Sequence, residues 1–243
     1  MIHELWPGGP RFEERKGVFR IGTDSVLLAN FANKKQVKKK RRVIDLGCGS
    51  GILSVLLAYD DPNIRIDGIE IVQEAAQLAS ANTKLCGLDD RITIIEGDLR
   101  QHRDLLRPGF YDIVISNPPY FATGSGKRTE KENMSASRTE GTCTLDDICR
   151  AAKYLTHTGG SLMLVHKPER LTDVFSAVKN AGFEPKRLRF VHHKSNSPPS
   201  IVLIESRNGG KPSLVVEAPL ILRKDDGCET EEIKQIYRRS TQV

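Results

Sequence analysis

Two segments of the chain combine residue types that could bind a small molecule. The segment "VIDLGCGSGIL" carries Asp45, followed by the three glycines Gly47, Gly49 and Gly51. Glycine lets the backbone turn tightly and approach a ligand closely, and the helix predicted to follow offers free N–H groups to a carboxylate or phosphate. The spacing is GxGxG and differs from the GxGxxG pattern of dinucleotide sites. The turn alone is therefore weak evidence, and the acids that follow it matter more.

Glu70 in "GIEI" and Asp98 in "EGDLR" each stand at the end of a predicted strand. In an open parallel sheet, ligands bind outside the carboxyl ends of the strands, so these acids and Asp45 are expected at one edge. A carboxylate there can hold ribose hydroxyls, and another can accept a hydrogen bond from an adenine amino group. The combination predicts a nucleoside site.

The segment "SNPPYF" follows the apolar run 111–115, which predicts a buried strand. Proline lacks an N–H and fixes φ, so the backbone after Asn117 is rigid and its carbonyls can serve a ligand. Asn117 Oδ1 and the Pro118 carbonyl could each accept one hydrogen of a planar amino group, which would aim the nitrogen lone pair at an electrophile. Tyr120 could stack on the planar substrate.

Strand-like and helix-like segments alternate from Val43 onward. We predict strands at 43–46, 65–71, 91–96, 111–116, 161–166, 187–192 and 201–205, and helices at 52–59, 73–86, 145–155 and 169–181. This alternation favours a mainly parallel sheet with helices on both faces. The linker "HKSNSPPS" is too short for a crossover helix, so the last two strands should form an antiparallel hairpin.

Residues 1–42 are expected to form an N-terminal extension, and residues 43–243 the main part of a single domain. Within the extension, Thr23 or Asp24 could cap a short helix that packs its apolar residues on the sheet edge. Near the C-terminus, "SLVVEAPLILR" and the helix-like "ETEEIKQIYRRS" suggest one more edge element.

In this order, "DLGCGSG", "GIEI", "EGDLR" and "NPPY" resemble the signature of class I S-adenosylmethionine-dependent methyltransferases. The resemblance implies a Rossmann-like α/β fold with a seven-stranded, mostly parallel sheet and an antiparallel C-terminal hairpin, and S-adenosyl-L-methionine as the cofactor. The finer similarity, in "RIGTDSVLLANF", "SNPPYF" and "VHHKSNSPPSIVLIE", is to bacterial tRNA(Val) (adenine-N6)-methyltransferases, which modify the adenine beside the anticodon. It implies an RNA partner.

The motifs and the resemblance together define three groups of candidate residues. The candidate catalytic residues are Asn117, Pro118 and Tyr120. The candidate cofactor-binding residues are Thr23, Asp45, Gly47, Cys48, Gly49, Gly51, Glu70, Asp98, Leu99 and Asn117. The candidate substrate-binding residues are Phe121, Lys127, Arg128, His192, His193 and Lys194. The histidines show no metal-ligand spacing, so no metal site is expected.

A net charge of +6 and a pI of about 9.1 favour an acidic partner. The loops 121–144 and 192–200 leave the carboxyl ends of parallel strands, so we expect RNA there, whereas "KKQVKKKRR" enters the first strand from the opposite edge. Five cysteines without a CxxC pair suggest neither disulfides nor zinc. No segment resembles a secretory signal or a membrane span, so a cytoplasmic protein is expected.

The "NPPY" motif identifies a planar nitrogen without naming the molecule that carries it. By resemblance it also occurs in rRNA guanine-N2 methyltransferases and in enzymes that methylate a glutamine of release factors. These often carry a duplicated or an N-terminal helical domain, for which this sequence offers little room. A non-catalytic RNA-binding protein is a further alternative. Transfer of label to RNA or to protein, and binding of S-adenosylmethionine, would separate these functions.

Overall fold

The computed structural model describes residues 2–14, 22–33, 40–118 and 143–239. Within these residues the main sheet has nine strands in the order β10-β8-β9-β7-β6-β3-β4-β5, with β11 also paired to β8. They are β3 (Arg41–Leu46), β4 (Ile64–Glu70), β5 (Ile92–Glu96), β6 (Tyr111–Ser116), β7 (Thr156–His166), β8 (Phe183–His192), β9 (Pro199–Asn208), β10 (Val215–Val216) and β11 (Leu220–Ile221). A separate hairpin joins β1 (Ile2–Glu4) to β2 (Arg11–Glu13).

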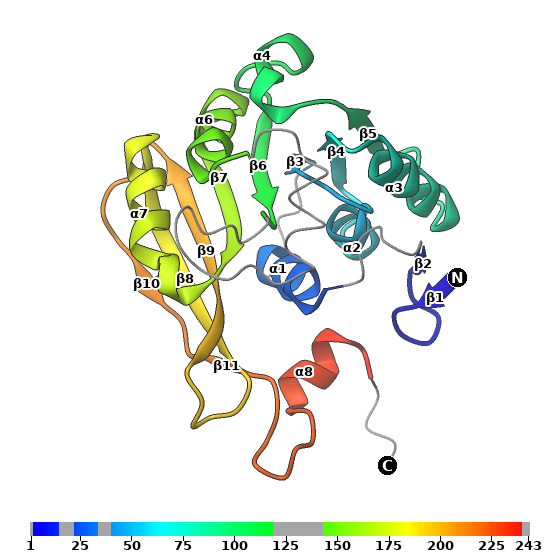
Figure 1. Ribbon diagram of the computed structural model, residues 1–243, viewed down its shortest axis with the longest axis vertical. Coiled ribbons are helices and arrows are strands. Elements are labelled where there is room, and N and C mark those ends of the chain that lie inside the picture. The colour runs from blue at the N-terminus through cyan, green and yellow to red at the C-terminus, as the bar shows by residue number, and fades with distance from the viewer. Residues whose placement is uncertain (1, 15–21, 34–39, 119–142, 240–243) are drawn as a thin grey trace, which may run out of the picture.

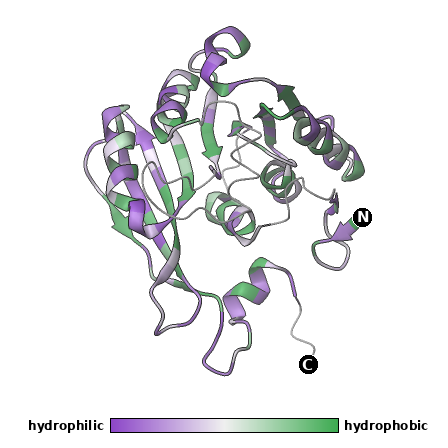
Figure 2. Ribbon diagram, in the orientation of Figure 1, coloured by the Kyte–Doolittle hydropathy of each residue, from purple (hydrophilic) through white to green (hydrophobic). Residues whose placement is uncertain are grey.

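Helices cover both faces of the sheet, as Figure 1 shows. One face carries α1 (Thr23–Asn33), α2 (Ile52–Asp60) and α3 (Gln73–Leu85), and the other carries α4 (His102–Leu105), α6 (Leu145–Leu155) and α7 (Leu171–Asn180). Short 3-10 turns, η1 (Leu99–Gln101) and η2 (Pro168–Arg170), precede α4 and α7, and α8 (Glu231–Ile236) follows the last strand. Hydrophobic residues are concentrated in the central strands, while hydrophilic residues lie on the outer surfaces of the helices (Figure 2).

The predicted mostly parallel α/β sheet is confirmed. Strands β5, β4, β3, β6 and β7 run parallel to one another, and β9 pairs antiparallel with both β7 and β8. The predicted C-terminal hairpin is therefore present, and the seven long strands are those expected from the sequence. The two-residue strands β10 and β11 extend the sheet beyond β8, where the sequence suggested one further edge element.

Helix α1 lies on a face of the sheet, which corrects the expectation that it packs on the sheet edge. It contacts α2, β7 and β9, and α8 packs against it as well. Seven of its eleven residues are buried, including Ser25. Because most residues of α1 are buried, the helix must pack against neighbouring elements on several sides. At the sheet edge, much of its apolar surface would be exposed to water. The C-terminal helix supplies part of that cover.

The N-terminal hairpin is fastened to α3 by Asn82, a residue that the sequence did not single out. Its side chain is fully buried; Nδ2 donates to the Ser50 carbonyl at 2.9 Å, and Oδ1 accepts from the Glu13 backbone N–H at 2.7 Å. One amide therefore joins β2, α3 and the glycine turn. In the described residues, no helix is both long and apolar enough to cross a bilayer.

Replacing Asn82 with alanine is expected to lower the free energy of unfolding by about 2 kcal/mol, because the buried Ser50 carbonyl and the partly buried Glu13 N–H both lose their partner. Urea denaturation would measure this change. Ser80→Ala is a matched control on the same helix, where the half-buried hydroxyl bonds only the Ala76 carbonyl. An Asn82→Ala protein as stable as this control would contradict the assigned role.

Candidate active site

The turn between β3 and α2 depends on its glycines. Gly47, Gly49 and Gly51 have φ values of 72°, 55° and 79°, a region that residues with a Cβ rarely adopt. A Cβ on Gly51 would also lie 3.2 Å from the Ala79 Cα. The N–H groups of Gly47 and Cys48 donate to the Ile69 carbonyl at 2.9 and 3.0 Å. The turn is thereby held against the end of β4.

Glu70, the last residue of β4, bonds to the same turn. Its side chain is buried; Oε2 accepts from the Gly49 N–H and Oε1 from the Val72 N–H, both at 2.9 Å. A carboxylate has about four acceptor positions, so each oxygen can accept a further bond from a ribose hydroxyl. The predicted role in ribose binding is compatible with this geometry, and it stays a prediction.

Asp45 lies at the end of β3 and is 1% exposed. Its Oδ2 accepts a hydrogen bond from Ser54 Oγ at 2.8 Å. Burial raises the pKa of Asp45 to about 7, and the nearby Glu70 carboxylate adds to the increase, while the Ser54 bond opposes it. A substantial fraction of this carboxyl group therefore carries a proton at neutral pH. A cationic ligand would favour its ionised form.

Asp98 follows β5 and caps η1, with Oδ1 accepting from the Arg100 N–H at 2.9 Å. The Arg100 guanidinium also donates hydrogen bonds to the carboxylate, with Nη2 2.6 Å from Oδ2. These hydrogen bonds hold the pKa of Asp98 below its usual range. If Asp98 also accepts a hydrogen bond from an adenine amino group, as predicted, its carboxylate would bind both that group and Arg100. Leu99 comes next, as the first residue of η1.

Asn117 follows β6 and is held from two directions. The preceding Ser116 is fully buried and donates from Oγ to the Leu46 carbonyl at 2.7 Å, which fixes the strand end beside β3. Asn117 Nδ2 donates to Ser25 Oγ of α1 at 3.0 Å, so its Oδ1 faces away from Ser25. Pro118 is buried directly after it. Ser25 was missed by the sequence reasoning; its only signal is a hydroxyl among the apolar residues of α1.

The turn and Asn117 meet in one pocket. It is lined by Ser25, Asp45, Gly47, Cys48, Gly49, Ser50, Ile52, Leu53 and Asn117. Five predicted cofactor residues are thus brought together, and Gly51 and Glu70 adjoin them through the turn. Thr23, Asp98 and Leu99 do not line it. Thr23 is exposed at the start of α1, where its side chain is hydrogen-bonded to that of Tyr237.

The predicted substrate residues are only partly described. Phe121, Lys127 and Arg128 lie outside the described residues, as does the candidate catalytic residue Tyr120. The others lie at the end of β8 and in the loop that follows it. His192, the last residue of β8, has Nδ1 2.7 Å from the Ser197 carbonyl, Lys194 Nζ donates to the Asp225 carbonyl at 3.2 Å, and His193 is exposed. They lie at the carboxyl end of β8, the same edge as Asn117. The described part of the chain contains no cluster of potential metal ligands.

The sheet order and the glycine turn at the end of β3 define a class I methyltransferase. The chain belongs to the methyltransferase small domain family, whose family model matches residues 11–182. It is 31% identical over 219 residues to the tRNA1(Val) (adenine(37)-N6)-methyltransferase of Yersinia pseudotuberculosis, covering 89% of this chain and 83% of that protein.

Solved structures show the same fold. A predicted O-methyltransferase of Agrobacterium tumefaciens superposes with a TM-score of 0.72 at 20% identity, over 89% of this chain and 96% of that one. The geranyl diphosphate C-methyltransferase of Streptomyces coelicolor, crystallised with S-adenosyl-L-homocysteine, gives 0.55 at 12% identity, over 75% and 80%. The protein is an S-adenosylmethionine-dependent methyltransferase.

Affinity for S-adenosylmethionine is expected to fall as the pH is lowered through about 7. The ammonium group of the methionine end would pair with ionised Asp45, and the raised pKa means that this carboxyl group becomes protonated on the acid side of about 7. Calorimetry between about pH 5.5 and about pH 8 would measure the trend. Asp45→Asn should bind weakly with little change over that range. The same pH trend in that variant would place the responsible group elsewhere.

Proposed function

We propose that the protein transfers a methyl group from S-adenosylmethionine to N6 of an adenine in a tRNA, beside the anticodon. The observation that carries the proposal is Asn117, whose amide is oriented by Ser25 in a pocket shared with Asp45 and the glycine turn. The curated relatives at 31% identity, which are named for adenine 37 of tRNA1(Val), support the choice of base and RNA.

The chemistry follows from the amino group. The lone pair of adenine N6 is delocalised into the ring, so the nitrogen is a poor nucleophile. Asn117 Oδ1 and the Pro118 carbonyl would each accept one N–H bond, which orients the lone pair toward the sulfonium methyl and stabilises the positive charge that grows on nitrogen. Bound S-adenosylmethionine would supply the methyl group: the N–C bond would form as the C–S bond breaks, with S-adenosylhomocysteine as the leaving group, and the nitrogen would then lose a proton to solvent.

The target base must leave its stack to reach this pocket. A stacked adenine in an anticodon loop hides its amino group, and enzymes that modify bases commonly extrude them. Tyr120 and Phe121, directly beyond the described strand end, are proposed to receive the base. In this arrangement Tyr120→Phe would retain most activity, because stacking needs the ring rather than the hydroxyl.

Two further assignments accompany the function. The described parts of residues 1–42 bury Trp6, Phe12 and Phe31 in the same core cluster as α2. This packing supports the proposal that the N-terminal extension and residues 43–243 form a single domain. A tRNA substrate would also place the enzyme in the cytoplasm.

Incubating the protein with methyl-labelled S-adenosylmethionine and total cellular RNA or protein would test the proposed function. We expect the label in tRNA, recovered as N6-methyladenosine beside the anticodon. Label in rRNA as N2-methylguanosine, or in a release-factor glutamine, would identify the alternative enzymes instead. A protein that fails to bind S-adenosylmethionine would fit the non-catalytic RNA-binding alternative.

A further inference from the structure

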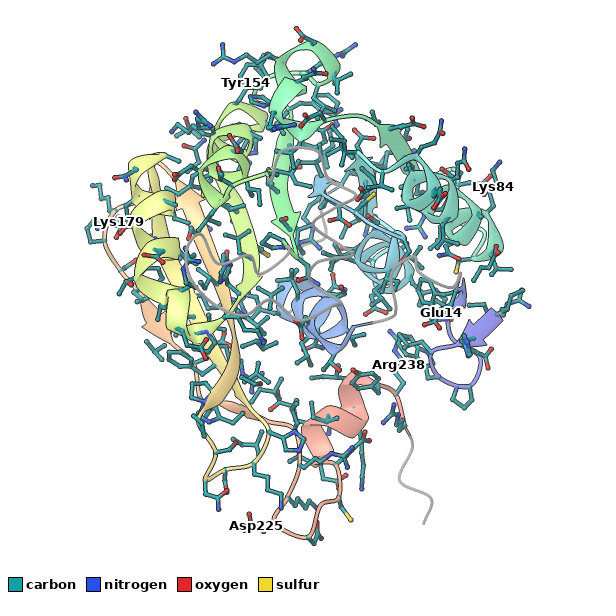
Figure 3. The ribbon with its side chains drawn as sticks, viewed as in Figure 1. Glu14, Lys84, Tyr154, Lys179, Asp225 and Arg238 are labelled. Atoms are coloured by element: carbon teal, nitrogen blue, oxygen red, sulfur yellow. The ribbon has the colours of Figure 1, made fainter. Side chains whose placement is uncertain are left out.

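A second hollow lies on the opposite face of the sheet from α1 and α2. It runs between η1, α4, α6 and the end of α7, and we name it the α4–α6 groove. Its lining includes Arg100, Arg103, Asp147, Arg150, Lys153 and Tyr154. None of the residues predicted to bind cofactor or substrate lines it. Figure 3 shows Tyr154 beside α4, far from the labelled Asp225 and Arg238 of the C-terminal segment.

The groove is rich in cations. Arg100 pairs with Asp98, and Arg150, whose side chain is 70% exposed, pairs with Asp147. The other two cations are exposed, and neither forms a salt bridge with any residue that the structure describes: the Arg103 guanidinium lies 5.2 Å from the Tyr154 ring centroid, and Lys153 Nζ donates to Asn208 Oδ1 at 2.5 Å. An anion entering the groove would meet these two charges without breaking an ion pair.

The cations are spread along the groove and do not converge on one point. Residues 147, 150, 153 and 154 follow one another along α6 over about 10 Å, at the spacing that places side chains on one helical face. Arg100 and Arg103 face them from η1 and α4. A single phosphate would need donors aimed at one centre, whereas an extended polyanion needs charges in a row. The arrangement fits a nucleic-acid backbone better than a small anion.

The groove also begins at the edge of the sheet where the parallel strands end and Asn117 lies. Arg100 follows Asp98 at the carboxyl end of β5, and η1 packs against α6, the helix that starts at Leu145. All the parallel strands end at this edge, including β6, which leads into Asn117. A bound RNA could therefore place one nucleotide at Asn117 and continue along α6.

We propose that the α4–α6 groove binds the phosphate backbone of the substrate RNA while the target base occupies the pocket at Asn117. This inference rests on the proposed function, since it names a surface for that same substrate. It adds a contact region that is separate from the loops expected to meet RNA from the sequence.

The test removes the two cations without salt bridges, in an Arg103→Gln, Lys153→Gln variant. The matched control is Lys40→Gln, Lys84→Gln, which also loses two exposed positive charges outside the groove; Figure 3 shows Lys84 on α3, well away from Tyr154. Dissociation constants for tRNA would be measured across a salt series. We expect the groove variant to bind tRNA about tenfold more weakly than the parent. The slope of log Kd against log salt concentration should be smaller by about two in this variant. Calorimetry should show unchanged affinity for S-adenosylmethionine, which verifies the fold.

Each outcome decides the matter. If the parent enzyme methylates tRNA and the groove variant binds tRNA like the control across the salt series, the inference is overturned and the proposed function stands. If the parent neither binds nor methylates RNA, both are overturned. A loss confined to the groove variant, with cofactor affinity retained, supports the groove as the backbone site.

Discussion

An Asn117→Ala enzyme is expected to keep its affinity for S-adenosylmethionine and most of its affinity for RNA, while transferring the methyl group on the order of 10²–10³ times more slowly. In the proposed mechanism the hydrogen bond from the amino group to Asn117 Oδ1 would strengthen as positive charge grows on the nitrogen, so its loss should act mainly on the chemical step. Single-turnover kinetics with tRNA would measure the rate, and calorimetry the cofactor affinity. A folded variant that transfers methyl at near the parent rate would mean that the two prolines hold only a turn.

Ser25 provides the internal control for this experiment. Its hydroxyl accepts from Asn117 Nδ2 at 3.0 Å, so in the proposed mechanism it would act on the reaction by orienting the amide. Ser25→Ala should slow the parent enzyme by roughly tenfold, a loss of about 1.4 kcal/mol. In the Asn117→Ala background the same change should have no further effect, because the group that Ser25 orients is gone. Additive effects of the two substitutions would show that Ser25 acts on something other than Asn117.

Replacing Glu70 with alanine is expected to weaken S-adenosylmethionine binding by tens-fold. Loss of a charged hydrogen-bond partner costs about 1.5–3 kcal/mol, and each 1.4 kcal/mol corresponds to about tenfold in affinity. Calorimetry on a folded variant would measure the change. Unchanged affinity would remove Glu70 from the cofactor site.

A second ligand separates ribose binding from support of the turn. Glu70 also accepts the N–H bonds of Gly49 and Val72, so its removal could loosen the turn without any ribose contact. S-adenosylhomocysteine and its 2′-deoxy analogue should bind the parent with different affinities. They should bind Glu70→Ala with nearly equal affinity, because the partner of the hydroxyl is absent. A difference of equal size in both proteins would assign Glu70 to the turn alone.

Local backbone chemistry governs the features of the fold and site that could be predicted from the amino-acid sequence. Three glycines in "GCGSG" predicted a tight turn, and the structure has that turn, with positive φ at all three glycines. Alternating apolar runs predicted the seven long strands, and the short linker before Ser200 predicted the hairpin of β8 and β9. Because parallel strands end at one edge, the same pattern also predicted Asp45, Glu70 and Asp98 at that edge.

Contacts between groups far apart in the chain could not be predicted and became visible only in the folded protein. Asn117 and Ser25 are 92 positions apart, and Glu13 and Asn82 are 69 apart; no local pattern links either pair. The position of α1 on a sheet face depends on α2, β7 and α8 together, and the α4–α6 groove exists only because η1 and α6 pack side by side. A propensity or a spacing describes neighbours along the chain. Hydrogen bonds and grooves between elements depend instead on how whole helices and strands pack, which is set by burial of their combined apolar surfaces.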